Sequence, residues 1–183
     1  MRRHAVNSSS LIVLLVLISF SSGVAGTSSK KIHAVRVASS ISVDGVLGEG
    51  DWKNAETLSD FQQYDPVEGA DPTEKTDVRV LFDDNALYIG IVCHDSDPNG
   101  IVKQLTRRDR TAQSDRVSVT IDSYHDHQTA FLFSGSVSNV QTDGVLSNDG
   151  REYDTQWDAV WEFQATITSD GWCGEFRILF SVL

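Results

Sequence analysis

Aromatic residues beside polar turns are the part of this sequence whose chemistry is most suggestive. A flat aromatic ring packs against the apolar face of a cyclic ligand such as a sugar, while nearby amide, carboxylate and guanidinium groups hydrogen-bond its hydroxyls. Trp157 and Trp172 stand next to turn residues, so we expect them at the surface, with core packing as the alternative. Trp52 follows the first predicted strand and Trp161 alternates with Phe163, so both fit core positions.

Two further segments supply groups for such a binding surface. The remaining candidate sugar-contacting residues are Tyr153, Gln156, Arg107 and Arg108. The first two lie in the same predicted loop as Trp157, and either arginine could bind hydroxyls or a carboxylate through paired N–H donors. The alternative for the arginines is an ion-pair network with Asp109 and Asp115, which belong to the same loop.

The segment from Asp95 to Gly100 carries the oxygen-bearing side chains of a calcium loop. Asp95, Asp97 and Asn99 stand at alternate positions before a glycine, as in loops whose oxygens surround Ca²⁺. The closing acid is missing, because Thr106 stands eleven positions after Asp95. Asp-Pro-Asn-Gly is also a turn sequence that needs no metal. Calcium is therefore a candidate cofactor, with a plain turn as the alternative.

The sequence contains no recognisable catalytic motif. Gly-x-Ser-x-Gly, His-Glu-x-x-His and phosphate-binding glycine loops are all absent. Glycoside hydrolysis needs two carboxylates about 5–9 Å apart in a cleft. Among 26 acidic residues, pairs at such distances arise by chance and indicate nothing. We therefore expect a non-catalytic protein.

The first 26 residues have the order of a secretory signal peptide. Arg2 and Arg3 precede an apolar run, 11–20, in which nine of ten residues are Leu, Ile, Val or Phe, and small residues follow. The run is too short to span a membrane as a helix, which takes about 20 apolar residues. We expect segment 1–26 to be removed and the rest to be exported to the periplasm, the outer membrane or the medium, without inserting into a membrane.

Net charge argues against one class of partner. Without the two arginines of the leader, 13 basic residues stand against 26 acidic ones, a formal net charge of −13. Nucleic acid and anionic membrane surfaces bind basic patches. We therefore expect no nucleic acid as a partner. The acidity suits a cation-binding protein, although solubility alone also explains it.

Short strands separated by turn residues must position these side chains. Alternating apolar residues predict strands at 41–43, 76–82, 87–93, 116–122, 130–133, 157–168 and 172–180. Only one or two helical turns are expected, within 51–58. This spacing indicates one all-β domain over 27–183, an antiparallel β-sandwich of immunoglobulin-like or jelly-roll-like type. Cys93 and Cys173 lie in strands, either as a disulfide or as free buried thiols.

The order of these segments resembles the family 9 carbohydrate-binding domains. The longest matching segments are ISVDGVLGEGDW (41–52), TDVRVLFDDNALYIGIVCHD (76–95) and DRVSVTID (115–122). Four shorter motifs are RRD (107–109), QTD (141–143), WDAVW (157–161) and GWCGEFRILF (171–180). These resemble a subgroup in which the domain stands at the N-terminus of large bacterial exported proteins with an outer-membrane β-barrel-like remainder. The similarity covers roughly residues 34–180.

The resemblance implies a β-sandwich that binds sugar, takes part in polysaccharide breakdown or uptake, and binds calcium. In sugar-binding members a ligand-stacking Trp stands three positions before the 115–122 strand, where this chain has Ala112. The partner aromatic lies in a part of the family beyond Leu183, which predicts a domain incomplete at its C-terminus. Two functions stay open: a carbohydrate-binding module, or a structural or interaction domain of an outer-membrane barrel protein that has lost the sugar slot.

Overall fold

Two β-sheets make up most of the described chain. The computed structural model describes residues 30–183 except Thr111, so the predicted signal peptide, 1–26, lies outside it. The strands are β1 (Val35–Arg36), β2 (Thr76–Phe82), β3 (Ala86–His94), β4 (Arg116–Ile121), β5 (Ala130–Ser136), β6 (Gln141–Ser147), β7 (Glu152–Asp154), β8 (Trp161–Thr168) and β9 (Gly171–Leu179). The helical elements of these residues are α1 (Gly50–Asn54), η1 (Pro98–Gly100) and η2 (Phe180–Val182). Within the described residues, no helix has the length and apolar character needed to cross a membrane.

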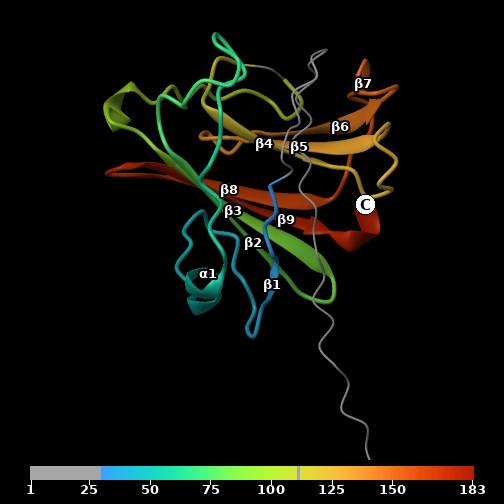
Figure 1. The fold of residues 1–183 in the computed structure, drawn as a ribbon, viewed down its shortest axis with the longest axis horizontal. Helices are drawn as coiled ribbons and strands as arrows, with labels where there is room; N and C mark the ends of the chain where they lie inside the picture. The colour runs from blue at the N-terminus through green and yellow to red at the C-terminus, as the bar shows by residue number, and fades with distance from the viewer. Residues whose placement is uncertain (1–29, 111) are drawn as a thin grey trace, which may run out of the picture.

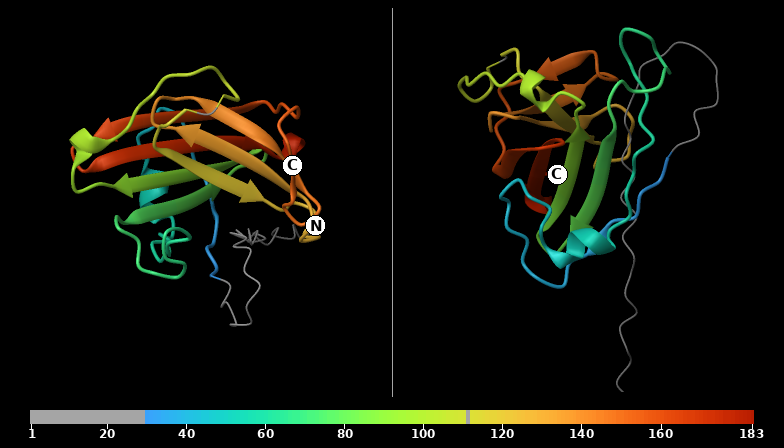
Figure 2. Two further views of the ribbon diagram at one scale, coloured as in Figure 1. Left: turned by 90° about the horizontal axis from the view of Figure 1, so that it is seen from above. Right: turned by 90° about the vertical axis from the view of Figure 1, so that its left-hand side faces the viewer.

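The two sheets stack face to face as a sandwich (Figure 1 and Figure 2). The larger sheet has the order β1-β2-β3-β9-β8, and the smaller sheet has the order β4-β5-β6-β7. Every pair of neighbouring strands is antiparallel except β1 and β2. The predicted all-β sandwich is therefore confirmed, with one short parallel edge strand that the sequence did not reveal.

The main core lies between the sheets. Inward-facing residues of the larger sheet, among them Val80 and Phe176, are 0% exposed. Val119 and Phe133 of the smaller sheet pack in the same core. Trp161 is 5% exposed and stacks on Phe176 with ring centroids 5.8 Å apart, so its predicted core position is confirmed. Each fully buried side chain of this kind contributes about 1.5–3 kcal/mol.

A second apolar layer covers the outer face of the larger sheet. Trp52, Leu81 and Tyr88 pack together there, with Trp52 only 1% exposed, which confirms its predicted core role. Figure 1 shows α1 on this side, below the larger sheet and away from the smaller one. Burial on both faces explains the nearly continuous apolar run of β3. The prediction of a strand at 41–43 is wrong. Ile41 is buried in this layer, but residues 41–43 pair with no strand.

Two antiparallel hairpins, β2–β3 and β8–β9, supply four of the strands of the larger sheet. The strand predicted at 76–82 coincides with β2, and β3 and β9 match their predicted ranges within two residues. The predicted strand at 157–168 starts late, because only residues from Trp161 onward pair with β9. Strands β6 and β7 were not predicted, and they complete the smaller sheet.

Cys93 and Cys173 are both free, although they lie in neighbouring strands. Cross-strand partners share a face, and here Cys93 pairs with Trp172 while Cys173 pairs with Val92. The two thiols therefore point to opposite faces of the larger sheet. Burial raises the pKa of Cys93 to about 12 and that of Cys173 to about 11, so both remain protonated.

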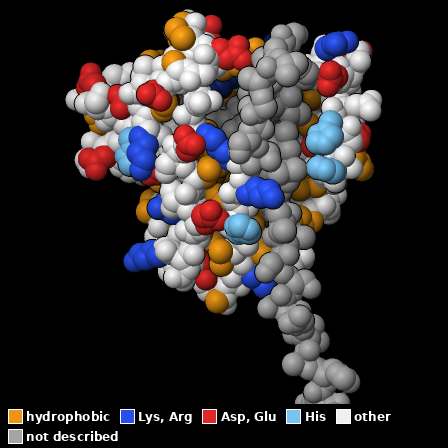
Figure 3. Space-filling view, in the orientation of Figure 1, with side chains coloured by type: hydrophobic (Ala, Val, Ile, Leu, Met, Phe, Trp, Pro, Cys, Tyr) orange, Lys and Arg blue, Asp and Glu red, His pale blue; other side chains and the backbone are white. Residues whose placement is uncertain are grey.

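Charged side chains are mixed over the surface rather than segregated. Figure 3 shows acidic and basic side chains interspersed among polar and hydrophobic ones on one face of the molecule. A mixed distribution of this kind does not concentrate the field of either sign on that face.

Candidate functional site

A polar surface covers the outer face of the smaller sheet, and we call it the β4–β7 face. The register places three hydroxyls in one row across the strands: Ser118 lies opposite Ser134, and Ser134 lies opposite Thr142. The Ser118 and Ser134 hydroxyls are 2.9 Å apart and hydrogen-bonded. In the neighbouring row, Arg116 lies opposite Ser136. This face therefore offers hydrogen-bonding groups, whereas the inner face of the same strands is mainly apolar, with Gln141 and Asp143 of β6 as the polar exceptions.

A small hollow lies where the segment 102–115 crosses the β4–β7 face. Its lining includes Gln104, Arg110, Ala112, Arg116, Ser134 and Thr142. The hollow measures about 10 Å³, which is room for about one water molecule. A sugar ring cannot enter a space of this size, so it would contact only the rim. Ala112, where the resemblance places a stacking Trp, is one of the lining residues.

Tyr153 is an exposed aromatic residue on this face. It lies opposite Leu146 in the β6–β7 pair, and its ring packs against Gly144, where a Cβ atom would overlap the ring. The residue is 45% exposed, so part of the ring is open to solvent. Burial, assisted by the charges of Asp143 and Asp109, raises the pKa of the Tyr153 hydroxyl, which keeps it able to donate a hydrogen bond.

Arg108 joins three segments around a buried carboxylate. Asp143 of β6 is 1% exposed, and its Oδ1 accepts a hydrogen bond from Arg108 Nη2 at 2.6 Å. Its Oδ2 accepts from the backbone N–H of Ala159, also at 2.6 Å. Arg108 Nη2 donates in addition to the Ala159 carbonyl at 3.0 Å. These contacts hold the 102–115 segment, β6 and the residues just before β8 together.

The predicted ion-pair network around Arg108 is present, with different members. Asp109 lies 3.5 Å and the exposed Asp158 lies 2.9 Å from the guanidinium nitrogens. Asp115 takes no part, because its carboxylate accepts a hydrogen bond from the backbone N–H of Val102 at 2.9 Å. The network therefore draws on motifs that lie far apart in the sequence.

The two candidate tryptophans do not lie on the β4–β7 face. Trp172 is 4% exposed and faces the main core beside Cys93, so the expected surface position is wrong. The strand begins directly after the turn, and its first side chain already points inward. Trp157 is half-buried, with its ring 4.9 Å from Phe131 and 5.9 Å from Phe133. Both rings are used mainly in packing.

Of the predicted sugar-contacting residues, Tyr153 and Arg108 both contact Asp143. Arg108 binds the Asp143 carboxylate, while the Tyr153 hydroxyl lies 3.5 Å from the Asp143 carbonyl. Gln156 and Arg107 are exposed in loops. Asp143 is the member that residue-type reasoning missed, and its only sequence signal was the QTD motif at 141–143.

At the predicted calcium loop the structure shows the geometry of the turn alternative. Asp95 Oδ1 accepts a hydrogen bond from the backbone N–H of Asp97 at 2.8 Å, which closes an ordinary Asx turn before the 3₁₀ turn that contains Asn99. Across the described residues, no group of three or more His, Cys, Asp or Glu side chains is placed to hold a metal ion. Calcium binding by Asp95, Asp97 and Asn99 therefore stays a prediction, while the observed hydrogen bond and 3₁₀ turn are those of an ordinary turn.

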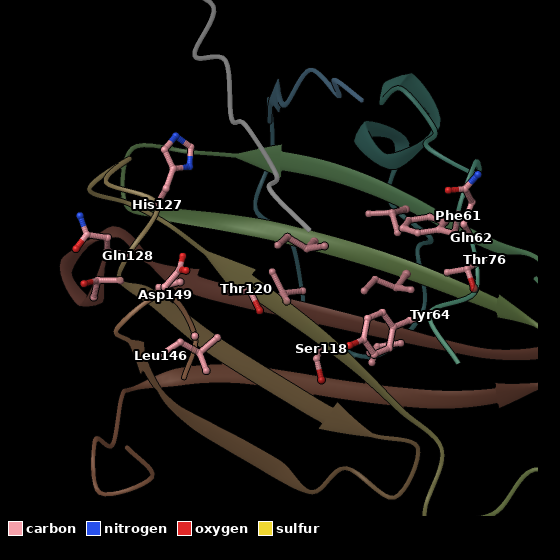
Figure 4. Close-up of a pocket in the computed structure, with 18 residues that line it drawn as sticks. Phe61, Gln62, Tyr64, Thr76, Ser118, Thr120, His127, Gln128, Leu146 and Asp149 are labelled. Atoms are coloured by element: carbon pink, nitrogen blue, oxygen red, sulfur yellow. The ribbon is translucent and has the colours of Figure 1, made fainter. Parts of the chain in front are cut away.

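A larger cleft of about 440 Å³ opens between the two sheets (Figure 4). Its walls are apolar and include Val78, Ile89, Ile91, Val117 and Val119. Figure 4 shows polar and aromatic side chains at its ends, with Phe61, Gln62 and Tyr64 at one end and His127, Gln128 and Asp149 at the other. Strand β4 is an edge strand of its sheet, so one side of its backbone has no strand partner among the described residues.

Comparison with solved structures supports the same fold. A family 9 carbohydrate-binding module from Caldicellulosiruptor kristjanssonii in complex with cellotriose superposes with a TM-score of 0.57 at 19% identity, covering 81% of this chain and 67% of that chain. The module from the same organism in complex with glucose gives a TM-score of 0.54 at 18% identity, covering 81% and 69%. At such identities the likeness concerns the fold alone. No curated protein sequence matches the chain.

The sequence also matches a family model, described as carbohydrate family 9 binding domain-like, over residues 43–183. The match takes in both sheets apart from β1, together with the hollow, Tyr153 and the Arg108 cluster. It covers well over half of the chain. The chain therefore belongs to the family 9 carbohydrate-binding domain-like proteins.

Proposed function

We propose that this protein is a non-catalytic carbohydrate-binding module whose ligand lies on the β4–β7 face. The observation that carries the proposal is Tyr153, an exposed ring beside a row of hydroxyls and two arginines, Arg110 and Arg116, that line the hollow. An aromatic ring next to hydrogen-bonding groups suits a sugar, which has apolar C–H faces and polar edges. Family membership and the likeness to modules solved with cellotriose and glucose support a glucose-based ligand.

Binding at this face is expected to be weak. Ala112 provides no ring at the position of the family's stacking Trp, and the hollow is too small to enclose a sugar. The ligand then stacks on one side only. A single aromatic contact is worth about 0.5–1.5 kcal/mol beyond the buried area, so low affinity follows.

The wider role is proposed from the sequence. The leader-like segment 1–26 supports export to the periplasm, the outer membrane or the medium. There the module would hold a polysaccharide or oligosaccharide during its breakdown or uptake, as an accessory to glycoside hydrolases or as part of a larger envelope protein.

Glycan binding by the purified protein tests the proposal. We expect retention by soluble and insoluble glucans in affinity electrophoresis and pull-down assays, and a measurable Kd for cello-oligosaccharides by titration calorimetry. Tyr153→Ala should weaken binding about 3- to 10-fold, because the stacking contact is lost. Tyr124→Ala is the matched control, since Tyr124 is 66% exposed and precedes β5 outside the hollow.

Equal losses in both tyrosine variants would place the ligand elsewhere. A folded protein that binds no glycan would reject the proposal and favour the second candidate function, an interaction domain. The apolar cleft and the free edge of β4 support that candidate, because an extended polypeptide strand can pair with an edge strand while its alternate side chains enter the cleft. The remainder of a barrel-containing parent protein is the partner that this candidate implies.

A further inference from the structure

Positive charge gathers in one segment of this acidic protein, at residues 102–116, which cross the β4–β7 face and enter β4. The five basic residues of the segment are Lys103, Arg107, Arg108, Arg110 and Arg116, and its two acidic residues are Asp109 and Asp115, a formal net charge of +3. The rest of the chain holds 10 basic and 24 acidic residues, a net charge of −14. At an ionic strength near 0.1 M, charges more than about 10 Å away are largely screened. The local excess of positive charge therefore acts on a ligand at this face.

The two acidic side chains of the segment are engaged with other groups. Asp109 lies 3.5 Å from Arg108 Nε, and its Oδ1 accepts a hydrogen bond from the backbone N–H of Asp143 at 3.4 Å. Asp115 accepts a hydrogen bond from the backbone N–H of Val102 at 2.9 Å. These carboxylates therefore do not neutralise the other arginines of the segment.

Arg110 and Arg116 are the two arginines that line the hollow. Within the part of the chain that the structure describes, neither guanidinium forms an ion pair with a carboxylate. Both residues are exposed, and the hydroxyl-bearing Ser134 and Thr142 line the same hollow. Two accessible cations thus stand beside the row of hydroxyls on this face.

The Arg116 guanidinium is oriented by Ala112, the residue that stands where the resemblance places a stacking Trp. Arg116 Nη2 donates a hydrogen bond to the Ala112 carbonyl oxygen at 2.8 Å. A guanidinium has five N–H donors in one plane, so this contact orients the group and leaves other donors for a ligand. The chain therefore presents an oriented cation next to the position that lacks the aromatic ring.

We propose, on the basis of the proposed function, that the β4–β7 face selects glycans that carry carboxylate groups, such as glucuronate polymers. Arg110 and Arg116 recognise the carboxylate, because a guanidinium binds a carboxylate through two parallel N–H···O bonds. Glucuronate differs from glucose only in the oxidation of C6, so its ring keeps the C–H face that packs on Tyr153.

The spacing of the strands favours an oligosaccharide over a single sugar. Strands β4 and β7 are the outer strands of a four-stranded sheet, which places them about 14 Å apart. Tyr153 belongs to β7 and Arg116 to β4. One sugar residue of a bound chain therefore packs on the tyrosine while another presents its carboxylate to the arginines.

A matched pair of oligosaccharides tests the ligand class with the purified protein. The probes are cellotetraose and the β-1,4-linked glucuronate tetramer, which differ in having a CH₂OH or a carboxylate group at C6. By titration calorimetry at low ionic strength, we expect the glucuronate tetramer to bind about 5- to 20-fold more tightly. Its methyl ester keeps the shape without the charge and should bind as weakly as cellotetraose. In about 0.5 M NaCl most of the preference should disappear, because the arginines are exposed.

Substitution of the two arginines tests the assignment to residues. Arg110→Gln and Arg116→Gln should each lower the preference for the glucuronate tetramer over its methyl ester about 3- to 5-fold. Lys53→Gln is the matched control, since it removes one positive charge from α1, on the opposite side of the molecule (Figure 1). This control should keep the full preference.

The proposal and the proposed function fail in different ways. If the glucuronate tetramer binds no more tightly than its methyl ester, carboxylate selection is overturned, while cellotetraose binding that Tyr153→Ala weakens still supports the proposed function. Equal losses of preference in all three charge variants would overturn the assignment to Arg110 and Arg116. A sulfated cellotetraose that binds as tightly as the glucuronate tetramer would overturn selection of carboxylates among anions. If the folded protein binds none of these oligosaccharides, both are overturned.

Discussion

A buried carboxylate is tolerated in a folded protein only where donors satisfy its oxygens, and Asp143 meets that condition through two short contacts. The guanidinium of Arg108 matches its charge, and the N–H of Ala159 uses its second oxygen. The same guanidinium lies beside Asp158, which is 77% exposed on its side chain. One arginine thus has a buried and an exposed partner. Water screens the exposed Arg108–Asp158 ion pair much more than the buried Arg108–Asp143 contact.

Replacing Asp143 should therefore cost far more stability than replacing Asp158. For Asp143→Ala we expect a loss of about 2–4 kcal/mol in the free energy of unfolding, because Arg108 and the Ala159 N–H lose their partner. For Asp158→Ala the expected loss is under about 1 kcal/mol, as for exposed ion pairs. Urea unfolding followed by tryptophan fluorescence measures both. Similar losses in the two variants would contradict the claim that the buried contacts of Asp143 stabilise the fold more than the exposed ion pair of Asp158.

Residue types alone predicted only part of this candidate site. Tyr153 and Arg108 were recognisable from their chemistry, but their shared contact with Asp143 depends on contacts among the 102–115 segment, β6 and the residues just before β8. The surface position expected for Trp172 is wrong because β9 begins at the turn itself, so a residue next to the turn can already face the core.

At the scale of the elements, Asp77 links β2 to its surroundings. Asp77 is 8% exposed, and its carboxylate accepts hydrogen bonds from Ser59, from Lys75 at 3.0 Å and from His94 at 3.0 Å. Burial acts to raise its pKa, but these hydrogen bonds prevail and lower the pKa from the ordinary 3.8 to about 2. The native state therefore binds this proton less readily than the unfolded state does.

Because the pKa of Asp77 is lower in the native state than in the unfolded chain, part of the free energy of unfolding depends on pH. The contribution of Asp77 is complete above pH 3.8 and is lost as the pH falls towards 2, because protonation then favours the unfolded chain. We expect Asp77→Asn to lower the free energy of unfolding by about 2 kcal/mol at pH 6 and by much less at pH 2. Urea unfolding at both pH values gives the two differences. A penalty that stays constant with pH would show that charge plays no part.

The strands that could be predicted are those in which the alternation of apolar and polar residues matches the buried and exposed faces of the sheet. In β2 the alternation of Val78, Val80 and Phe82 matches the inner face, and the turn before β3 is polar. Strand β6 was missed because Gln141 and Asp143 occupy inward positions, where their partners are the arginine and backbone groups of other segments. Strand β1 has two residues and pairs in parallel, so only tertiary contacts define it.

On the scale of the whole molecule, the two sheets pack closely in one region and are separated by a cleft in another. Gly135 of β5 lies against the ring of Phe163 of β8, so that a Cβ atom at this glycine would overlap the ring. Phe163 packs in turn on Phe176, with ring centroids 4.7 Å apart. The 440 Å³ cleft lies elsewhere, between β4 and the pair β2–β3. The sheets are therefore held by close packing at the β5–β8 contact.

Adding one methyl group at that contact should disturb the packing of the two sheets. For Gly135→Ala we expect a loss of about 1–3 kcal/mol, because Phe163 is surrounded by buried rings and cannot move aside without displacing them. Gly50→Ala is the matched control: a Cβ there meets nothing within 4 Å, and alanine favours the short helix α1. Thermal unfolding of both variants measures the difference. If Gly135→Ala were as stable as Gly50→Ala, the sheets would have room to separate at β5–β8, and the cleft would then mark a generally loose interior rather than one open side of a rigid sandwich.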